Sequence, residues 1–240
     1  MKQKIIFQSI PENKVFKFLK LNKQRKILNF LNQHDLYQSN KEPLFRETLL
    51  EKQNINFIDG FIISAYLSIT NLRKVSRTSG PILTRDFLSN AELSQNKKHF
   101  FIGLEKEDLD NLQTKFPHLK KVSSYNPPYI KDLNFSLGEI EKIAKLINEE
   151  KSDYIWVGIG CPKQNILSSL LFKKTKAQYF VNVGAAIDFL LEKKKQAPAI
   201  FRKLGVEWFY RLITDFKYSK KKVWRSLVGL RYLNQTKIEK

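Results

Sequence analysis

The 240-residue chain contains a single cysteine, Cys161, so an internal disulfide cannot form and a reducing compartment is expected. Acidic residues are also scarce, because 23 Asp and Glu stand against 43 Lys and Arg and leave a net charge of +20. No stretch approaches the roughly 20 uninterrupted apolar residues of a membrane-spanning helix, and the first residues lack the apolar core of a signal peptide. The excess of positive charge favours an anionic partner, with nucleic acid and an anionic membrane surface as the two candidates.

The dinucleotide-binding fingerprint Gly-x-Gly-x-x-Gly is missing too. After Gly158 and Gly160 the third position is Lys163, so the sequence does not support a nicotinamide-dependent dehydrogenase. Asp108 and Asp110 form an Asp-x-Asp pair of the kind that can hold a metal, but two residues apart on a helix they point in different directions. No metal or cofactor is therefore expected.

What the sequence does contain is an alternation of short, β-branched and aromatic runs with helical patterns. Strands that end in glycine or at a turn are predicted within 54–60, 99–104, 122–125, 154–157 and 179–183, and helices within 43–52, 61–72, 107–116 and 136–151. Ser136 is the expected N-cap of the last of these helices, with Glu139 completing a capping box. The run 24–31 is expected to be a helix, and 34–40 a short strand entering a loop. The alternation predicts an α/β fold, a Rossmann-like parallel sheet covered by helices.

The last 28 residues differ from the rest of the chain. Lysines and arginines alternate there with aromatic and aliphatic residues at helical spacing, a pattern typical of a helix that lies on an anionic membrane surface. A solvated basic tail is the alternative, and the Trp224 and leucine content argues against it. We therefore expect an α/β domain over 1–212 and a basic, amphipathic, membrane-binding appendage over 213–240. Its candidate membrane or acceptor contacts are Lys220, Lys221, Lys222, Trp224 and Arg225.

Four motifs follow one another in the second half of the chain. They are Gly160-x-Pro162-Lys163-Gln164, Val183-Gly184-Ala185-Ala186-x-Asp188-Phe189, Ala197-Pro198 and Gly205-x-Glu207-Trp208-x-x-Arg211-Leu212. In this combination and order the chain resembles the WecG/TagA/CpsF glycosyltransferases, which form glycosyltransferase family twenty-six. A lone glycine turn would be a weak signal, whereas four ordered motifs are much more specific.

The resemblance implies a catalytic group in the first third of the chain. Asp59-Gly60 matches an Asp-Gly pair at a strand end where relatives are thought to place a general base, and a helix cap or turn is the alternative role of Asp59. Relatives usually carry Thr-x-Asn near the reacting groups, and we align this motif with Gln38 and Asn40, so that glutamine replaces the threonine. Arg77 then corresponds to a diphosphate contact, with an ordinary solvated cation as the alternative.

The resemblance also implies substrate contacts in the second half of the chain. Gly160 and Gln164 would hold the phosphate or hydroxyls of a nucleotide sugar, with a water-facing residue in the first turn of a helix as the alternative role of Gln164. Asp188 would contact the ribose or base, with a local cap or a salt bridge to a nearby lysine as the alternative. Glu207 and Arg211 would line the site from a further helix, or simply form an ion pair within that helix. Two further positions depart from the family pattern, because Ile82 replaces an acidic residue and Asn165 replaces a glutamate.

These features predict an inverting glycosyltransferase that moves a sugar from a UDP-sugar to a polyprenyl-diphosphate-linked saccharide during synthesis of bacterial surface polysaccharide. The expected partners are the donor, the acceptor, an anionic membrane surface and, where the chain self-associates, a second copy in a homo-oligomer. The expected location is cytoplasmic, peripheral on the inner face of the cell membrane. A catalytically inactive UDP-sugar-binding homologue and a nucleic-acid-binding protein remain as alternatives, although no recognition motif for nucleic acid is present.

Overall fold

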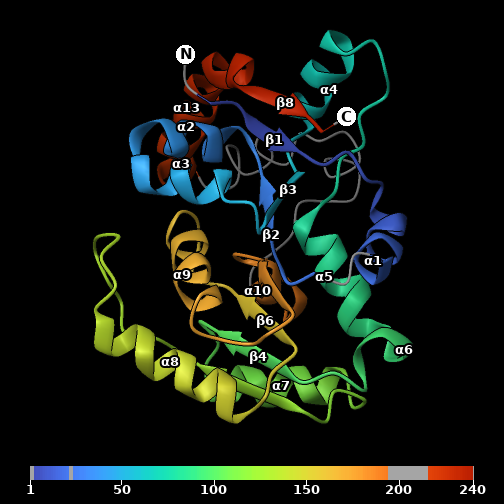
Figure 1. Ribbon diagram of the computed structural model, residues 1–240, viewed down its shortest axis with the longest axis vertical. Helices are drawn as coiled ribbons and strands as arrows, with labels where there is room; N and C mark the ends of the chain where they lie inside the picture. The colour runs from blue at the N-terminus through green and yellow to red at the C-terminus, as the bar shows by residue number, and fades with distance from the viewer. Residues whose placement is uncertain (1–2, 22–23, 194–215, 240) are drawn as a thin grey trace.

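A computed structural model describes residues 3–21, 24–193 and 216–239, and its centre is one parallel β-sheet (Figure 1). Six strands lie side by side, in the order β3 (Asn54–Ile58), β2 (Lys26–Leu31), β7 (Tyr179–Asn182), β6 (Tyr154–Val157), β4 (His99–Ile102) and β5 (Val122–Tyr125). All neighbours in the sheet are parallel. The Rossmann-like α/β fold predicted from the sequence is confirmed.

Helices cover both faces of this sheet (Figure 1). In chain order they are α1 (Glu12–Leu21), α2 (Gln33–Lys41), α3 (Pro43–Leu50), α4 (Phe61–Thr70), α5 (Gly80–Ser89), α6 (Ala91–Ser94), α7 (Lys106–Lys115), α8 (Leu137–Glu149), α9 (Lys163–Phe172), α10 (Ala186–Leu190) and α13 (Phe216–Gly229), followed by the 3-10 helix η1 (Leu230–Gln235). The four helices predicted within 43–52, 61–72, 107–116 and 136–151 are confirmed as α3, α4, α7 and α8.

Two local predictions are wrong. The run 24–31 contains strand β2 and not a helix, because this central strand is buried on both faces and its apolar residues show no simple period of two. The stretch 34–40 is helical and belongs to α2. Asn32 caps that helix by accepting from the backbone N–H of His34, and Asp35 accepts from the backbone N–H of Asn32 in return, so a capping box starts the helix.

The prediction for the N-terminus of α8 is confirmed for Ser136 and wrong for Glu139. Ser136 accepts a hydrogen bond from the backbone N–H of Glu139, as predicted for an N-cap. The Glu139 side chain, however, accepts from the hydroxyl of Tyr125 at 2.8 Å. Glu139 therefore ties α8 to strand β5 and does not complete a capping box.

Alternate side chains of the strands enter different layers of the core. Phe101, Trp156 and Val181 pack with α1, α5, α7 and α10 on one face of the sheet. Phe100, Ile155 and their neighbours pack with α8 and α9 on the other. The alternation is that of strands buried on both faces, as a parallel sheet requires.

The C-terminal part of the chain returns to its beginning. Strand β8 (Thr236–Ile238) pairs in parallel with β1 (Ile5–Phe7), and the two form a separate small sheet. Helix α13 lies against α2, and Gly229 at its end meets the start of α2. The predicted basic helix is therefore present, and it packs on the α/β sheet domain along α2.

Candidate functional site

The turns at the carboxyl ends of the parallel strands meet at one edge of the sheet. Asn32 follows β2, Asp59 follows β3, Gly158 follows β6 and Val183 follows β7. In open parallel sheets this is the edge where ligands bind. Four of the site residues predicted from the sequence, Asp59, Gly160, Gln164 and Asp188, lie on these turns or in the first turn of the helix that follows.

Asp59 and Arg77, 18 residues apart in the sequence, are brought into contact. Arg77 Nε donates to the backbone oxygen of Asp59 at 2.5 Å, and Nη2 lies 3.4 Å from carboxylate Oδ1. The side chain of Arg77 is 26% exposed and that of Asp59 is 22% exposed. The carboxylate is thus oriented by the guanidinium and remains partly open to a ligand.

The segment that carries Arg77 is fixed by its neighbours. Thr78 donates its backbone N–H to Ile58 O at 2.7 Å and its hydroxyl to Ile10 O at 2.6 Å. The backbone N–H of Ser79 donates to the carboxylate of Glu12 at 2.7 Å. The segment that carries Arg77 is therefore held beside β3 by hydrogen bonds to Ile58, Ile10 and Glu12. Helix α5 begins at Gly80, and Ile82 lies in its first turn.

Two residues beside Asp59, Asn32 and Gln33, were not predicted as site residues from the sequence. A Cβ atom at Gly60 would lie 2.6 Å from Gln33 Oε1 and 3.2 Å from Asn32 Cα, so the start of α2 sits directly against the Asp59 turn. The backbone N–H of Asp59 also donates to Leu31 O at 2.9 Å. The sequence feature that could have predicted the start of this helix is the capping pattern Asn-x-x-Asp, which begins at Asn32 directly after an apolar run.

Gln38 and Asn40 lie further along α2 than Asn32 and Gln33. Since a helix rises about 1.5 Å per residue, they are roughly 8 to 11 Å from the start of α2 along its axis. The Asn40 amide donates to Leu36 O at 3.1 Å. The structure thus places Asn32 and Gln33, but neither Gln38 nor Asn40, against the turn that carries Asp59.

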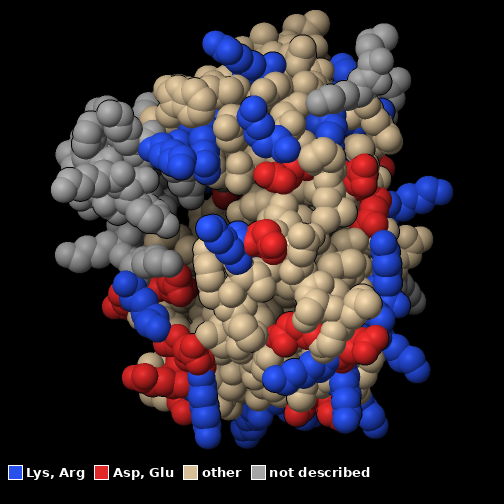
Figure 2. All heavy atoms as spheres, turned by 90° about the vertical axis from the view of Figure 1, so that its left-hand side faces the viewer, with Lys and Arg blue, Asp and Glu red and all other residues tan. Residues whose placement is uncertain are grey.

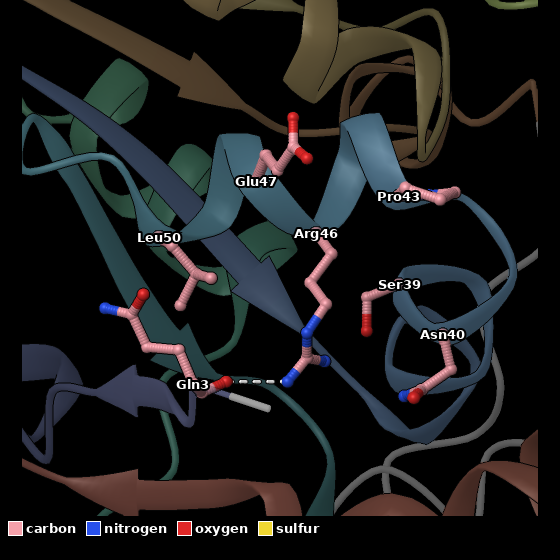
Figure 3. A pocket seen from close by; sticks show the side chains of 7 residues that line it. All are labelled: Gln3, Ser39, Asn40, Pro43, Arg46, Glu47 and Leu50. Carbon is pink, nitrogen blue, oxygen red and sulfur yellow. Dashed lines mark hydrogen bonds between the residues drawn. The ribbon is translucent and has the colours of Figure 1, made fainter. Parts of the chain in front are cut away.

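Asn40 instead lines a pocket centred on Arg46 (Figure 3). The pocket measures about 230 Å³, and its walls are Gln3, Ser39, Asn40, Pro43, Arg46, Glu47 and Leu50. Arg46 is 8% exposed, its Nη2 donates to Gln3 O at 2.7 Å, and its buried Nη1 has no hydrogen-bond partner in the described part of the chain. Burial lowers the pKa of this guanidinium, since the charged form loses its hydration.

Gln164 connects the turns after β6 and β7. It is buried, and its side-chain oxygen accepts from the backbone N–H of Gly184 at 3.0 Å. Gly160 and Gly184 have φ angles of +88° and +54°, a left-handed region that glycine adopts without strain. The amide nitrogen of Gln164 is then the group through which this residue can donate to a ligand.

Asp188 lies in the first turn of α10, which packs against α5, the helix that follows Arg77. Near it, Lys193 binds Asp108 at 2.8 Å. The pKa of Lys193 is raised, first by its hydrogen bond to Asp108 and to a smaller extent by the charge of Asp188. Asp108, half of the Asp-x-Asp pair, is therefore engaged by a lysine. Among residues 3–21, 24–193 and 216–239, no group of three His, Cys, Asp or Glu is placed to hold a metal ion.

Asn165, where the family pattern has a glutamate, is part of a buried network of amides beneath α9. Its Nδ2 donates to Asn29 Oδ1 at 2.8 Å, and Asn182 Nδ2 donates to the same oxygen at 2.7 Å. Asn29 in turn donates to Asn54 and Asn56, both at 2.9 Å. Asn165 therefore links α9 to strand β2, and Asn182 joins β7 to the same oxygen.

The basic helix α13 reaches the same region. Trp224 packs edge-on against Tyr37, with ring centroids 6.1 Å apart, and the Arg225 guanidinium lies 5.8 Å from the Tyr37 ring. Lys221 is exposed, whereas the side chains of Lys220 and Lys222 lie outside the described part of the structure. Glu207 and Arg211, together with the motif at Ala197-Pro198, also lie outside the described residues.

Lys and Arg on the face shown in Figure 2 are dispersed among Asp and Glu and do not form one continuous stripe. A continuous basic stripe would be the usual footprint of nucleic-acid binding. No helix within the described ranges is both long and apolar enough to cross a bilayer.

A parallel α/β sheet with glycine turns, an oriented carboxylate and a hydrogen-bonded amide at its carboxyl edge defines a Rossmann-like protein, and this is the edge at which open parallel sheets bind ligands. The model of the glycosyl transferase WecG/TagA/CpsF family matches residues 5–238, and the chain belongs to this family. The resemblance seen in the four motifs is thereby confirmed.

Similar proteins include N-acetylglucosaminyldiphosphoundecaprenol N-acetyl-beta-D-mannosaminyltransferases of Staphylococcus aureus. Those of strains NCTC 8325 and COL are 33% identical over 126 residues, which cover 51% of this chain and 46% of the relative. That of strain MRSA252 is 39% identical over 79 residues, 33% of this chain and 31% of the relative. The chain thus matches less than half the length of these curated relatives.

Proposed function

We propose that this protein is a glycosyltransferase that moves a sugar from a UDP-sugar to a polyprenyl-diphosphate-linked saccharide in bacterial surface polysaccharide synthesis. The sugar is of the N-acetylmannosamine type or another hexose. Membership of a glycosyl transferase family supports the reaction class. The names of the similar proteins support an undecaprenyl-diphosphate-linked N-acetylglucosamine as acceptor and N-acetylmannosamine as the transferred group.

The observation that carries the proposal is the geometry of Asp59. Its carboxylate lies at the carboxyl edge of the sheet, is oriented by Arg77 and is still 22% exposed. A general base needs this combination, because it must be positioned within reach of a substrate proton and yet be accessible to the substrate.

The proposed step is a direct displacement. The acceptor hydroxyl oxygen attacks the anomeric carbon from the face opposite the UDP group, and its proton passes to Asp59. The bond between the anomeric carbon and the UDP oxygen breaks, and its electron pair leaves with UDP. A single displacement of this kind inverts the anomeric configuration.

The negative charge that develops on the leaving diphosphate has to be stabilised by fixed donors. We assign this role to Arg77, with Arg211, Lys221 and Arg225 as further cations, and to the backbone N–H groups around Gly160 at the start of α9. On this assignment Gln164, Asp188 and Glu207 bind the donor nucleotide.

Asn32 and Gln33 extend the proposed site. Their contact with Gly60 puts an asparagine and a glutamine next to the base, in the neighbourhood where the sequence comparison had suggested Gln38 and Asn40. Both amides offer donors and acceptors suited to the hydroxyl and acetamido groups of a sugar.

We further propose that the protein works at the cytoplasmic face of the cell membrane. The exposed Lys221 and the half-exposed aromatic ring of Trp224 on α13 support attachment to an anionic leaflet, together with Lys220, Lys222 and Arg225 of the same helix.

The test is turnover on anionic vesicles that carry polyprenyl-diphosphate N-acetylglucosamine, with a panel of UDP-sugars and UDP release as the signal. One donor should give release, and Asp59→Asn should abolish it while UDP still binds. Asp86→Asn is the matched control, because Asp86 is an exposed acid on α5 that pairs with Arg85.

The remaining outcomes separate the alternatives. UDP binding without release from any donor would indicate a catalytically inactive homologue. Failure to bind UDP would overturn the proposal, and turnover retained by Asp59→Asn would remove Asp59 as the base. Nucleic acid that displaces the protein from anionic vesicles at physiological salt would favour the nucleic-acid-binding alternative.

A further inference from the structure

Helix α4 and the residues just after it form an uncharged stretch in a strongly charged protein. From Phe61 to Leu72 there is no Asp, Glu, Lys or Arg, although 28% of the chain is charged. The stretch begins two residues after Asp59 and ends at the exposed cations Arg73 and Lys74. Helix α4 stands at the top of the molecule in Figure 1, at the margin of the fold.

One side of α4 is buried and the other is apolar and exposed. Ile63 and Leu67 belong to the core cluster that contains Leu233 and Ile238 of the C-terminal region. On the open side, Phe61 is 50%, Ile69 74% and Leu72 94% exposed. Large apolar side chains exposed together on one segment are a mark of an interaction surface.

The serine and threonine hydroxyls of α4 and the amide of Asn71 already donate to backbone oxygens within the protein. The hydroxyls of Ser68 and Thr70 donate to backbone oxygens one turn earlier, at 2.7 and 3.0 Å, and the Asn71 amide donates to Leu67 O at 2.8 Å. Ser64 donates to Val75 O at 2.7 Å. Moving this helix into a medium without water would therefore leave none of these donors unpaired, which is the main requirement for entering lipid.

Leu72 is the residue least explained by folding. Its φ angle is +49°, in the left-handed region that is unfavourable for leucine, and its side chain contributes almost no burial in return. Asparagine or glycine would suit this backbone better. A strained, exposed leucine between an apolar helix and two cations points to contact with something outside the chain.

We propose that the tip of α4, formed by Ile69 and Leu72 with Arg73 and Lys74, inserts into the interface of an anionic membrane. The apolar pair would enter the acyl boundary, and the two cations would contact lipid phosphates. Arg73 also donates to Glu239 O at 3.3 Å, so this tip borders the C-terminal region that follows α13. The inference rests on the proposed function in one respect: a membrane-anchored acceptor would reach Asp59 along α4.

The paired serine and threonine hydroxyls of α4 and the flanking cations favour a bilayer over a protein partner. A protein surface would tolerate free hydroxyls, which could pair across the interface, whereas hydrocarbon would not. The charge of +20 likewise matches an anionic leaflet and opposes association with a second copy.

The experiment measures partition of the full chain onto vesicles without donor or acceptor, at a 7:3 ratio of phosphatidylcholine to phosphatidylglycerol. Leu72→Asn and Ile69→Asn should each lower the partition constant about tenfold. Leu137→Asn is the matched control, since Leu137 is an exposed leucine on α8 that does not belong to the α4 surface. Leu72→Asn should melt no lower than the parent, because asparagine tolerates the left-handed backbone.

A spin label provides a second readout. A nitroxide at position 72, in a Cys161→Ser background, should gain contact with oxygen dissolved in the bilayer when vesicles are added, and a label at position 137 should not. Equal partition of all variants together with an unchanged label would overturn the proposal.

Variants that leave partition unchanged but alter self-association would also overturn it in favour of a second copy. UDP release is scored separately, on a short-chain acceptor without vesicles. A failure of the proposed enzymatic function would therefore be visible independently of the membrane result.

Discussion

The indole Nε1 of Trp156 donates a hydrogen bond to Nδ1 of His99 across 3.1 Å, between the two adjacent strands β4 and β6. The other ring nitrogen, Nε2, lies 3.0 Å from Ser94 O, so the neutral imidazole carries its proton on Nε2 and accepts on Nδ1. Protonation would place a second N–H directly against the indole N–H. The pair therefore fixes the tautomer of a buried histidine in the middle of the sheet.

This relationship predicts a pH dependence of stability. Burial lowers the pKa of His99 in the folded protein, with smaller opposing contributions from Ser94 and Asp153, so the unfolded chain binds a proton first as the pH falls. The free energy of unfolding should fall below about pH 6.5, by at most about 1.4 kcal/mol per pH unit, until the folded-state pKa is reached. Urea titrations between pH 7.5 and 5 measure this slope. His99→Gln should lose most of it, and an unchanged slope would assign the effect to another group.

Arg77 is predicted to act through the orientation of Asp59 as well as through its charge. Arg77→Lys keeps the cation but loses the fork that binds both the backbone oxygen and the carboxylate of Asp59. We expect at least a tenfold loss in kcat for Arg77→Lys and a larger one for Arg77→Gln, at UDP-sugar concentrations that saturate the site. Steady-state UDP release measures both. Full activity of Arg77→Lys would show that charge alone is required.

Gly229 is predicted to be essential for docking of α13. A Cβ there would lie 1.9 Å from the backbone oxygen of Gln33, so an alanine would force α13 away from α2 and from the Asp59 site. Hydrogen exchange of the α13 amides should accelerate markedly in Gly229→Ala. Gly138→Ala is the matched control, because a Cβ at Gly138 meets nothing within 4 Å and alanine favours a helix. Equal exchange in both variants would contradict this packing.

Restoring the family's glutamate at position 165 should harm the fold. Asn165→Glu replaces the Nδ2 donor with a buried carboxylate that faces the oxygen of Asn29, and we expect a cost of about 3 kcal/mol in the free energy of unfolding. Urea unfolding measures this cost, with Asn111→Glu on the exposed side of α7 as control. An unchanged midpoint would mean that the amide network rearranges to accept the charge.

The sequence predicted those parts of the fold whose signals are local. The strands around Tyr154 and Tyr179 end at glycine turns, and α8 has both an apolar face and a serine cap. Strand β2 was mistaken for a helix because its burial on both faces removes the alternation by which strands are recognised. The start of α2 was missed because the reciprocal cap of Asn32 and Asp35 was overlooked.

The candidate site could be predicted in composition but not in geometry. Asp59 and Arg77 were both singled out, yet their pairing depends on how Thr78 binds Ile58 and Ile10, which involves residues far apart in the sequence. The hydrogen bond of Asn165 could not be predicted from the sequence either, because its partner Asn29 lies on strand β2, 136 residues away.

The parallel pairing of β1 with β8 has a consequence for biosynthesis. Phe7 and Ile238 are register partners separated by nearly the whole chain, and the backbone N–H of Glu239 donates to Phe7 O at 3.0 Å, so this small sheet closes a very long loop and has to form late. At about 5 to 20 residues per second, a ribosome needs roughly 10 to 50 s to deliver the partner of β1. During that time β1 lacks its partner strand β8. A nascent chain that stalls before residue 236 therefore exposes the unpaired edge of β1 to chaperones and proteases.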